Sequence, residues 1–125
     1  MVKSIIYTLT AIALCAGFFI FTDYYVHTQF DDFHGAVETL YEKVENGTAN
    51  REDAYAVRAM WTDKKSKLHV FLPHNDISYV DHLLNETCGF IYTGNYELAL
   101  SKTEDLLAIS TTLPDSYTVR LENVL

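Results

Sequence analysis

The sequence is poor in the residues that build disulfide-rich and zinc-binding proteins. Its 125 residues include only two cysteines, two prolines and five glycines. Cys15 lies in an apolar run and Cys88 in a predicted helix, with no CxxC motif and no Cys/His cluster. A disulfide would have to join Cys15, inside the apolar run, to Cys88 in the rest of the chain. Structural zinc takes four nitrogen or sulfur ligands. We therefore expect no disulfide framework, no metal and no cofactor.

Basic residues are also scarce. The chain has 9 Lys and Arg against 17 Asp and Glu, a formal net charge of −8. Lys3 is the only charged side chain before Asp23, so residues 23–125 carry 8 basic and 17 acidic groups, a formal −9. Nucleic acids and anionic lipid headgroups repel such a domain. We expect no nucleic-acid partner.

Catalytic motifs are absent as well. The sequence contains no nucleophile elbow, HExxH, Walker loop, Rossmann fingerprint or Ser/His/Asp ordering, and we predict that the protein is not an enzyme. Two stripes of His and acidic residues recur at helical spacing and resemble half-sites for a divalent metal. Two ligands from one helix bind a metal weakly, so we interpret both stripes as solvated helix faces, with a weak metal-binding or hydrolytic protein as the alternative. The stripes are His27, Asp31, His34 and Glu38, and His82 and Glu86.

One long apolar run stands out against these absences. Residues 4–22 carry no charge, and a helix of this length rises roughly 28 Å, close to the hydrocarbon thickness of a bilayer. A cleaved signal peptide and a lipoprotein are the alternatives. Cleavage near Ala13 to Gly17 would leave an apolar tail, and Leu14 stands where a lipoprotein needs a small residue before Cys15. We predict an uncleaved transmembrane anchor over residues 1–22.

Charge sets the expected orientation of this anchor. Lys3 and the terminal amine lie on one side, and Asp23, Asp31 and Asp32 lie on the other. Basic residues stay on the cytoplasmic side, so the N-terminus should be cytoplasmic and the domain extracytoplasmic in a single-pass protein of the cell membrane.

Apolar periodicity predicts helices along the rest of the chain. Val26, Phe30, Phe33, Val37, Leu40 and Val44 form a heptad-like seam. The anchor should therefore continue into the domain as one helix that ends near Asn46-Gly47. A second helix begins at Asn50 as N-cap and runs toward Leu72 and Pro73.

A third helix is expected to start within residues 74–76, with Asn75 or Asp76 as its cap. The fourth covers about 96–112 and stops at Leu113-Pro114. We therefore predict a helical domain over 23–114 and a tail over 115–125 that adds at most a short helix. No window alternates as a strand does. The fold class is all-α: a transmembrane helix continuing into a four-helix, two-hairpin antiparallel bundle. Its packing is tetratricopeptide-like, since residues 94–100 read like the opening of such a helix.

Four residues are singled out as structural or interaction sites: Trp61, Phe71, His74 and Asp76. Trp61 is expected in the core, with its indole N–H bonded to a helix-end carbonyl, and an exposed anchor for a partner is the alternative. His74 follows Pro73 at an interhelical corner, where it caps or bridges the junction or, alternatively, senses pH or contacts a partner.

The order of these features resembles a known family. An apolar anchor is followed by a helix that carries Trp61 and by the sequence segment 71–77. A further helix then begins after Gly94-Asn95, and the chain ends in Leu-Glu-Asn-Val-Leu. The chain resembles the small bacterial membrane-anchored proteins catalogued as domain of unknown function 4363. Pro73 and Ser78 depart from the pattern of that family, and Ser78 stands where the family carries an acidic residue. The resemblance implies a helical architecture and a bacterial source, and it implies no activity.

These patterns together favour a tethered module over an enzyme. We predict that the extracytoplasmic domain binds a protein partner or serves as an accessory module. In the alternative, the protein is an accessory subunit that pairs with a larger integral protein through Ala11, Ala13, Ala16 and Gly17 of its membrane helix. A homo-oligomer joined through the 26–44 seam is a further expectation.

Overall fold

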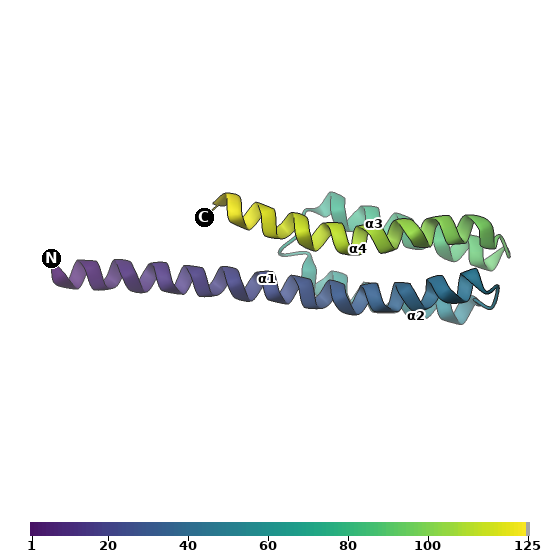
Figure 1. Cartoon of the computed structure of the whole chain (residues 1–125), viewed down its shortest axis with the longest axis horizontal. Coiled ribbons are helices and arrows are strands. Elements are labelled where there is room, and N and C mark those ends of the chain that lie inside the picture. The colour runs from purple at the N-terminus through teal and green to yellow at the C-terminus, as the bar shows by residue number, and fades with distance from the viewer. Residues whose placement is uncertain (125) are drawn as a thin grey trace.

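The computed structural model describes residues 1–124 and shows four helices, labelled in Figure 1. They are α1 (Val2–Glu45), α2 (Arg51–Leu68), α3 (His74–Tyr92) and α4 (Tyr96–Val124). No strand occurs within the described residues. The predicted all-α fold is confirmed. Leu125, the last residue of the predicted tail, lies outside the described residues.

The four helices form a closed antiparallel bundle. Successive helices form the hairpins α1–α2 and α3–α4, α2 packs on α3, and the most extensive contact is between α1 and α4. The contact between the first and last helices closes the ring, so a single core lies among all four elements.

The predicted seam of α1 forms one wall of that core. All six residues from Val26 to Val44 are buried, as is Thr22. They recur every three or four residues on one face of a continuous helix, as coiled-coil-like packing requires. The apolar N-terminal run and the first helix of the domain are therefore one element of 44 residues.

The turns follow their local sequence. Gly47 and Gly94 have φ of 71° and 74°, the left-handed conformation that a glycine adopts without steric cost after a helix. Asn50 begins α2 in a capping box, in which its side chain accepts from the Asp53 N–H and the Asp53 carboxylate accepts from the Asn50 N–H. Both predicted boundaries, the end of α1 and the start of α2, are confirmed.

The predicted start of α3 within residues 74–76 is confirmed, since the helix begins at His74, but the predicted cap, Asn75 or Asp76, was wrong. Pro73 is the N-cap, and its carbonyl accepts from the N–H groups of Asp76 and Ile77. Its φ of −58° suits a helix start, so Asn75 and Asp76 lie within the first turn. α2 also ends earlier than its apolar pattern predicted, at Leu68, and residues 69–73 form the loop.

The predicted end of α4 was also wrong. The helix continues through Pro114 to Val124, so residues 115–124 are helical. A proline inside a helix removes one hydrogen bond and costs roughly 3 kcal/mol. Tertiary contacts on both sides of the proline offset that cost: Leu113 and Tyr117 are buried, and Arg120 donates to Asp76 over 3.1 Å.

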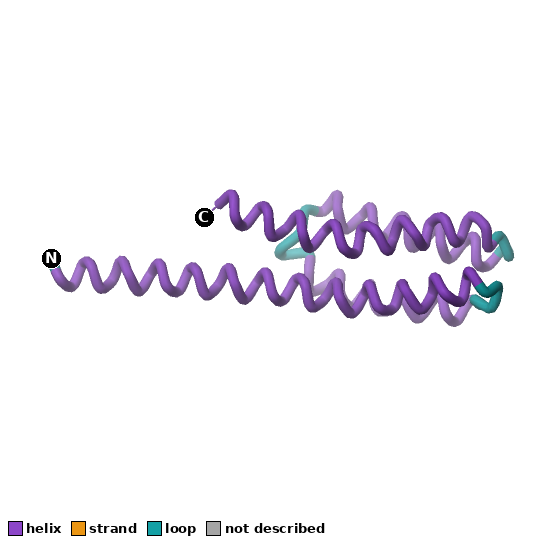
Figure 2. The backbone as a smooth tube through the Cα atoms, in the orientation of Figure 1, coloured by secondary structure: helices purple, strands orange, loops and turns teal. Residues whose placement is uncertain are grey.

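The first part of α1 projects beyond the bundle (Figure 2). Residues 1–18 are all exposed although most are apolar, and α1 is long and apolar enough to cross a membrane. No other helix in the described part of the chain meets that test.

Candidate functional site

Trp61 lies at the centre of the bundle. It is 1% exposed, and its ring centroid lies 5.0 Å from that of Phe33 and 6.1 Å from that of Phe30, both on α1. Its indole N–H donates to the Asp81 carboxylate on α3 over 2.7 Å, and Lys65 lies 3.2 Å from the same carboxylate. The core interpretation is confirmed, but the acceptor is a side chain and not a helix-end carbonyl.

Phe71, His74 and Asp76 lie together at the end of the bundle nearest the projecting half of α1. The Phe71 ring contacts Tyr25 of α1 and Tyr117 of α4, with centroid distances of 5.8 and 6.3 Å. Asp76 pairs with Arg120 of α4, and the exposed His74 ring lies 3.3 Å from the Ser78 hydroxyl. Phe71 thus ties the α2–α3 loop to α1 and α4, and Asp76 ties the first turn of α3 to α4. The His74 contact stays within α3, and Pro73 occupies the cap position, so the predicted capping or bridging role of His74 was wrong. Trp61 lies apart from these residues in the core.

Asp81 is the residue that sequence reasoning missed in this region. Its contact with Trp61 joins positions twenty apart on two helices. No local spacing signals such a pair, because it depends on how α2 and α3 are rotated against each other.

The two His/acidic stripes bind other side chains in the structure. His34 lies 2.6 Å from the Ser110 hydroxyl, and His27 lies 3.5 Å from both Asp23 and Asp115. Among residues 1–124, no group of three or more His, Cys, Asp or Glu side chains is placed to hold a metal.

The second stripe gains a partner from α4. His82 lies 2.5 Å from Glu86, whose other carboxylate oxygen lies 2.8 Å from Lys102. The Lys102 hydrogen bond lowers the pKa of Glu86 despite partial desolvation. The carboxylate is therefore held as an anion by Lys102 of α4, beside His82 on its own helix, an arrangement that joins α3 to α4.

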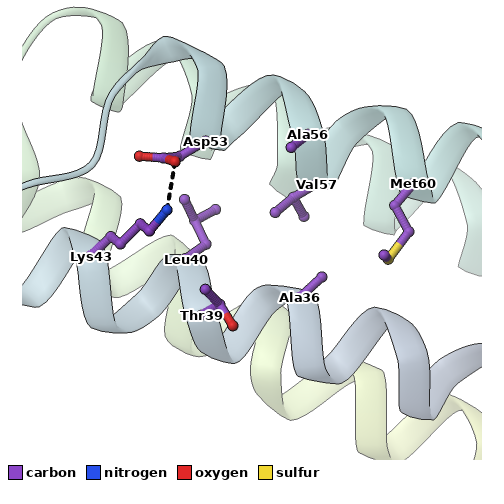
Figure 3. Close-up of a pocket in the computed structure, with 8 residues that line it drawn as sticks. All are labelled: Ala36, Thr39, Leu40, Lys43, Asp53, Ala56, Val57 and Met60. Atoms are coloured by element: carbon purple, nitrogen blue, oxygen red, sulfur yellow. Dashed lines mark hydrogen bonds and ion pairs between the residues drawn. The ribbon is translucent and has the colours of Figure 1, made fainter.

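A shallow groove runs between α1 and α2 (Figure 3). It measures about 220 Å³, and Ala36 of α1 lies there opposite Val57 and Met60 of α2, with Ala56 beside Val57. Lys43 and Asp53 close one end with a 2.7 Å ion pair. The Lys43 hydrogen bond, joined by the backbone N–H of Asn50, lowers the pKa of Asp53. The groove is mostly apolar and offers no chemistry beyond contact.

An aromatic cluster lies near the end of the bundle farthest from the projecting half. Tyr55 is 54% exposed, and its ring centroid lies 5.5 Å from that of Tyr92. The Arg51 guanidinium lies 5.1 Å from the Tyr92 ring centroid, within cation–π range. Two causes raise the pKa of Tyr92 to about 12: burial, which is the larger, and the nearby Tyr55 hydroxyl. Tyr and Arg are enriched where proteins bind proteins.

Comparison with known proteins found no matching family model, no matching curated protein and no matching solved structure. The resemblance to domain of unknown function 4363 therefore stays a prediction. The geometry of the chain carries the functional argument that follows.

Proposed function

We propose that this is a single-pass membrane protein that holds its four-helix domain outside the cytoplasm as a protein–protein interaction or accessory module. The observation that carries the proposal is the continuity of α1. Its exposed apolar half and its buried seam belong to one unbroken helix, with the domain packed around the second half. Such a helix holds the domain at a fixed distance and angle from the bilayer.

Charge supports the proposed orientation. Lys3 is the only charged side chain before Asp23, and the remainder of the chain is strongly acidic. The positive-inside rule then keeps the short N-terminal segment in the cytoplasm. An acidic domain is also repelled by anionic headgroups and by nucleic acid, which favours a protein partner.

Membrane extraction and labelling test the anchor and its orientation. The full chain is expected to stay in the membrane pellet after alkaline carbonate washing. An Asn46→Cys variant presents a thiol at the exposed turn after α1, and an impermeant maleimide should label it in intact cells. A matched Val2→Cys variant, on the N-terminal side of the uncharged run, should react only after lysis. Carbonate release would refute the anchor, and the reverse labelling pattern would refute the orientation.

The accessory-subunit alternative differs in where the partner attaches. The exposed apolar half of α1 favours the accessory-subunit alternative, because the exposed side chains of Ile5 and Ile12 can contact a partner helix. Photo-crosslinking residues at Tyr55 and Leu98 probe the domain, and the same residues at Ile5 and Ile12 probe the span. A crosslinked protein obtained from the domain positions alone supports the interaction module. One obtained from the span positions alone supports the accessory subunit.

A further inference from the structure

The basic residues of the domain are concentrated on one helix. α2 carries 5 of the 8 Lys and Arg in residues 23–125 but only 3 of the 17 Asp and Glu, so it is basic within a strongly acidic domain. Arg51, Arg58 and Lys65 recur every seven residues and therefore share one side of α2. Lys65 pairs with Asp81, so this side borders α3. We call the outer face formed by α2 and α3 the basic face.

The opposite face of the bundle is acidic. Asp31, Glu38 and Glu45 also recur every seven residues and are exposed along α1. Tyr41, one turn from both glutamates, donates to Glu104 of α4 over 3.4 Å, so this side of α1 borders α4. We call the outer face formed by α1 and α4 the acidic face. Figure 1 shows α1 and α4 in front of α2 and α3, so the two faces lie on opposite sides of the bundle.

Both faces carry charges that the fold does not neutralise. Among residues 1–124, ion pairs engage every lysine of the domain but neither Arg51 nor Arg58. The Arg51 guanidinium lies over the Tyr92 ring, and Tyr55, on the same side of α2, is exposed. Within the same residues, the three carboxylates of α1 on the acidic face form no ion pair. Each face is therefore suited to a partner of opposite charge.

The ion pairs between α1 and α2 fix which residues of the two helices lie at the same height. Lys43 pairs with Asp53, and Lys64 pairs with Asp32. The helices are antiparallel, so one step back along α1 matches one step forward along α2. The same register makes three further pairs level: Arg51 with Glu45, Arg58 with Glu38, and Lys65 with Asp31. The cations of the basic face and the carboxylates of α1 therefore share their heights and a spacing of roughly 10 Å.

A membrane anchor preserves these heights between neighbouring copies. This step rests on the proposed function, in which every copy has one orientation and one depth in the bilayer. A sideways displacement in the membrane plane then brings the acidic face of one copy against the basic face of the next. α1 meets the neighbouring α2, with each carboxylate level with a cation. The 26–44 seam cannot make such a contact, because it is buried in the chain's own core.

We propose that copies of this protein associate head to tail in the membrane plane, with the basic face of one against the acidic face of the next. Arg58 and Glu38 form the central contact, beside the exposed Tyr55. Tyr and Arg are enriched in protein–protein interfaces. Exposed ion pairs are individually weak and screened by salt, so association depends on the shared height and falls at high ionic strength. Because the contact joins two different faces, it propagates as an open row of copies.

Energy transfer between copies tests the proposal. The full chain carries Val2→Cys for labelling and Cys15→Ser to remove the other exposed thiol, since Cys88 is buried. Donor-labelled and acceptor-labelled copies are reconstituted together in liposomes. Arg58→Glu should weaken their association about tenfold, because it places like charges opposite each other. Lys67→Glu changes the net charge equally on the opposite side of α2 and should leave association unchanged.

Glu38→Arg separates the proposed contact from general repulsion between acidic domains. It makes the chain less acidic, so general repulsion predicts stronger association, whereas the proposed contact predicts association about tenfold weaker. Donor-labelled Arg58→Glu copies mixed with acceptor-labelled Glu38→Arg copies should associate again. Each variant then offers the charge that its neighbour needs, and no contact within one chain can restore the signal.

Three outcomes would overturn the proposal. Energy transfer at the chance level for the wild type excludes the row and leaves a separate acidic protein as the occupant of the basic face. Equal losses for Arg58→Glu and Lys67→Glu, or no recovery in the mixture, exclude the contact between Arg58 and Glu38. Carbonate washing keeps this test apart from the proposed function. Protein that stays in the membrane at chance-level transfer refutes the row alone, whereas protein released by carbonate refutes the anchor.

Discussion

The two halves of α1 are one helix in two environments. Residues 1–18 are exposed and largely apolar on every face, whereas residues 22–44 bury one residue in every three or four against the other helices. In water, an amphipathic helix is stabilised when its apolar stripe packs against other helices. A helix that is apolar all round needs lipid or a large protein core. The backbone is the same throughout, so the distribution of side chains decides which solvent each half requires.

The largest expected effect breaks the buried half. Trp61→Ala removes the ring that packs on Phe30 and Phe33 and leaves a cavity, which should cost about 3–5 kcal/mol of unfolding free energy. For a domain of this size, Tm should fall by at least about 10 °C. Thermal unfolding of the full chain in detergent, followed by circular dichroism, measures the change.

The matched control lies on the exposed half. Phe18→Ala also removes an aromatic ring, but from a side chain that is 60% exposed, and it should leave the Tm of the domain unchanged. Equal losses in the two variants would mean that the halves do not differ in their packing, and the comparison would fail.

The next effect breaks the exposed half. Ile12→Lys places a charge near the middle of the apolar run, at a cost of roughly 2.5–3.5 kcal/mol for insertion. The variant should shift substantially into the carbonate-soluble fraction while the domain keeps its wild-type Tm. Ile12→Val is the control and should stay in the membrane. If Ile12→Lys remains fully membrane-bound, the apolar half does not act as the span.

A smaller effect sharpens the boundary between the halves. Thr118→Val keeps the shape of the side chain but removes the hydrogen bond to Asp23, which should cost about 0.5–1.5 kcal/mol. The midpoint of chemical denaturation measures it. Thr112→Val removes a hydroxyl that bonds only within α4, and it should change the midpoint less. Equal midpoints for the two variants would show that the Thr118 contact does not stabilise the junction.

The sequence predicted those parts of the fold that local chemistry decides. The heptad spacing from Val26 identified the buried face of α1, and Asn50 and Gly47 marked helix ends through their own backbone preferences. Pro114 misled the prediction because its local cost is real. Contacts of Tyr117 with Phe71 in the α2–α3 loop and of Arg120 with Asp76 in α3 outweigh that cost, and no local pattern reports them.

The candidate sites were less predictable for the same reason. Burial of Trp61 followed from its place in an apolar stripe, but its acceptor Asp81 depends on the packing of α3 against α2. The groove lined by Phe19 of α1 and by Thr118 and Leu121 of α4 needs α4 to pass Pro114, so a prediction that ended the helix there excluded it. Side chains brought together by helix packing are invisible to spacing along a single chain.

The smallest effect concerns the far end of the buried half, where Lys43 of α1 pairs with Asp53. Folding lowers the pKa of Asp53 from its ordinary value of 3.8, so the unfolded chain binds this proton more readily than the folded one. The stabilisation is complete above about pH 4 and is lost as the pH falls through the lowered value. Asp53→Asn should therefore lose stability at neutral pH, and the deficit should shrink as the medium is acidified. Denaturation midpoints between pH 3 and 7 measure this deficit.

Asp63→Asn, whose partner Lys67 lies one turn away on the same helix, controls for a change of charge alone. A deficit for Asp53→Asn that stays constant with pH would show that the ion pair does not secure the end of α1.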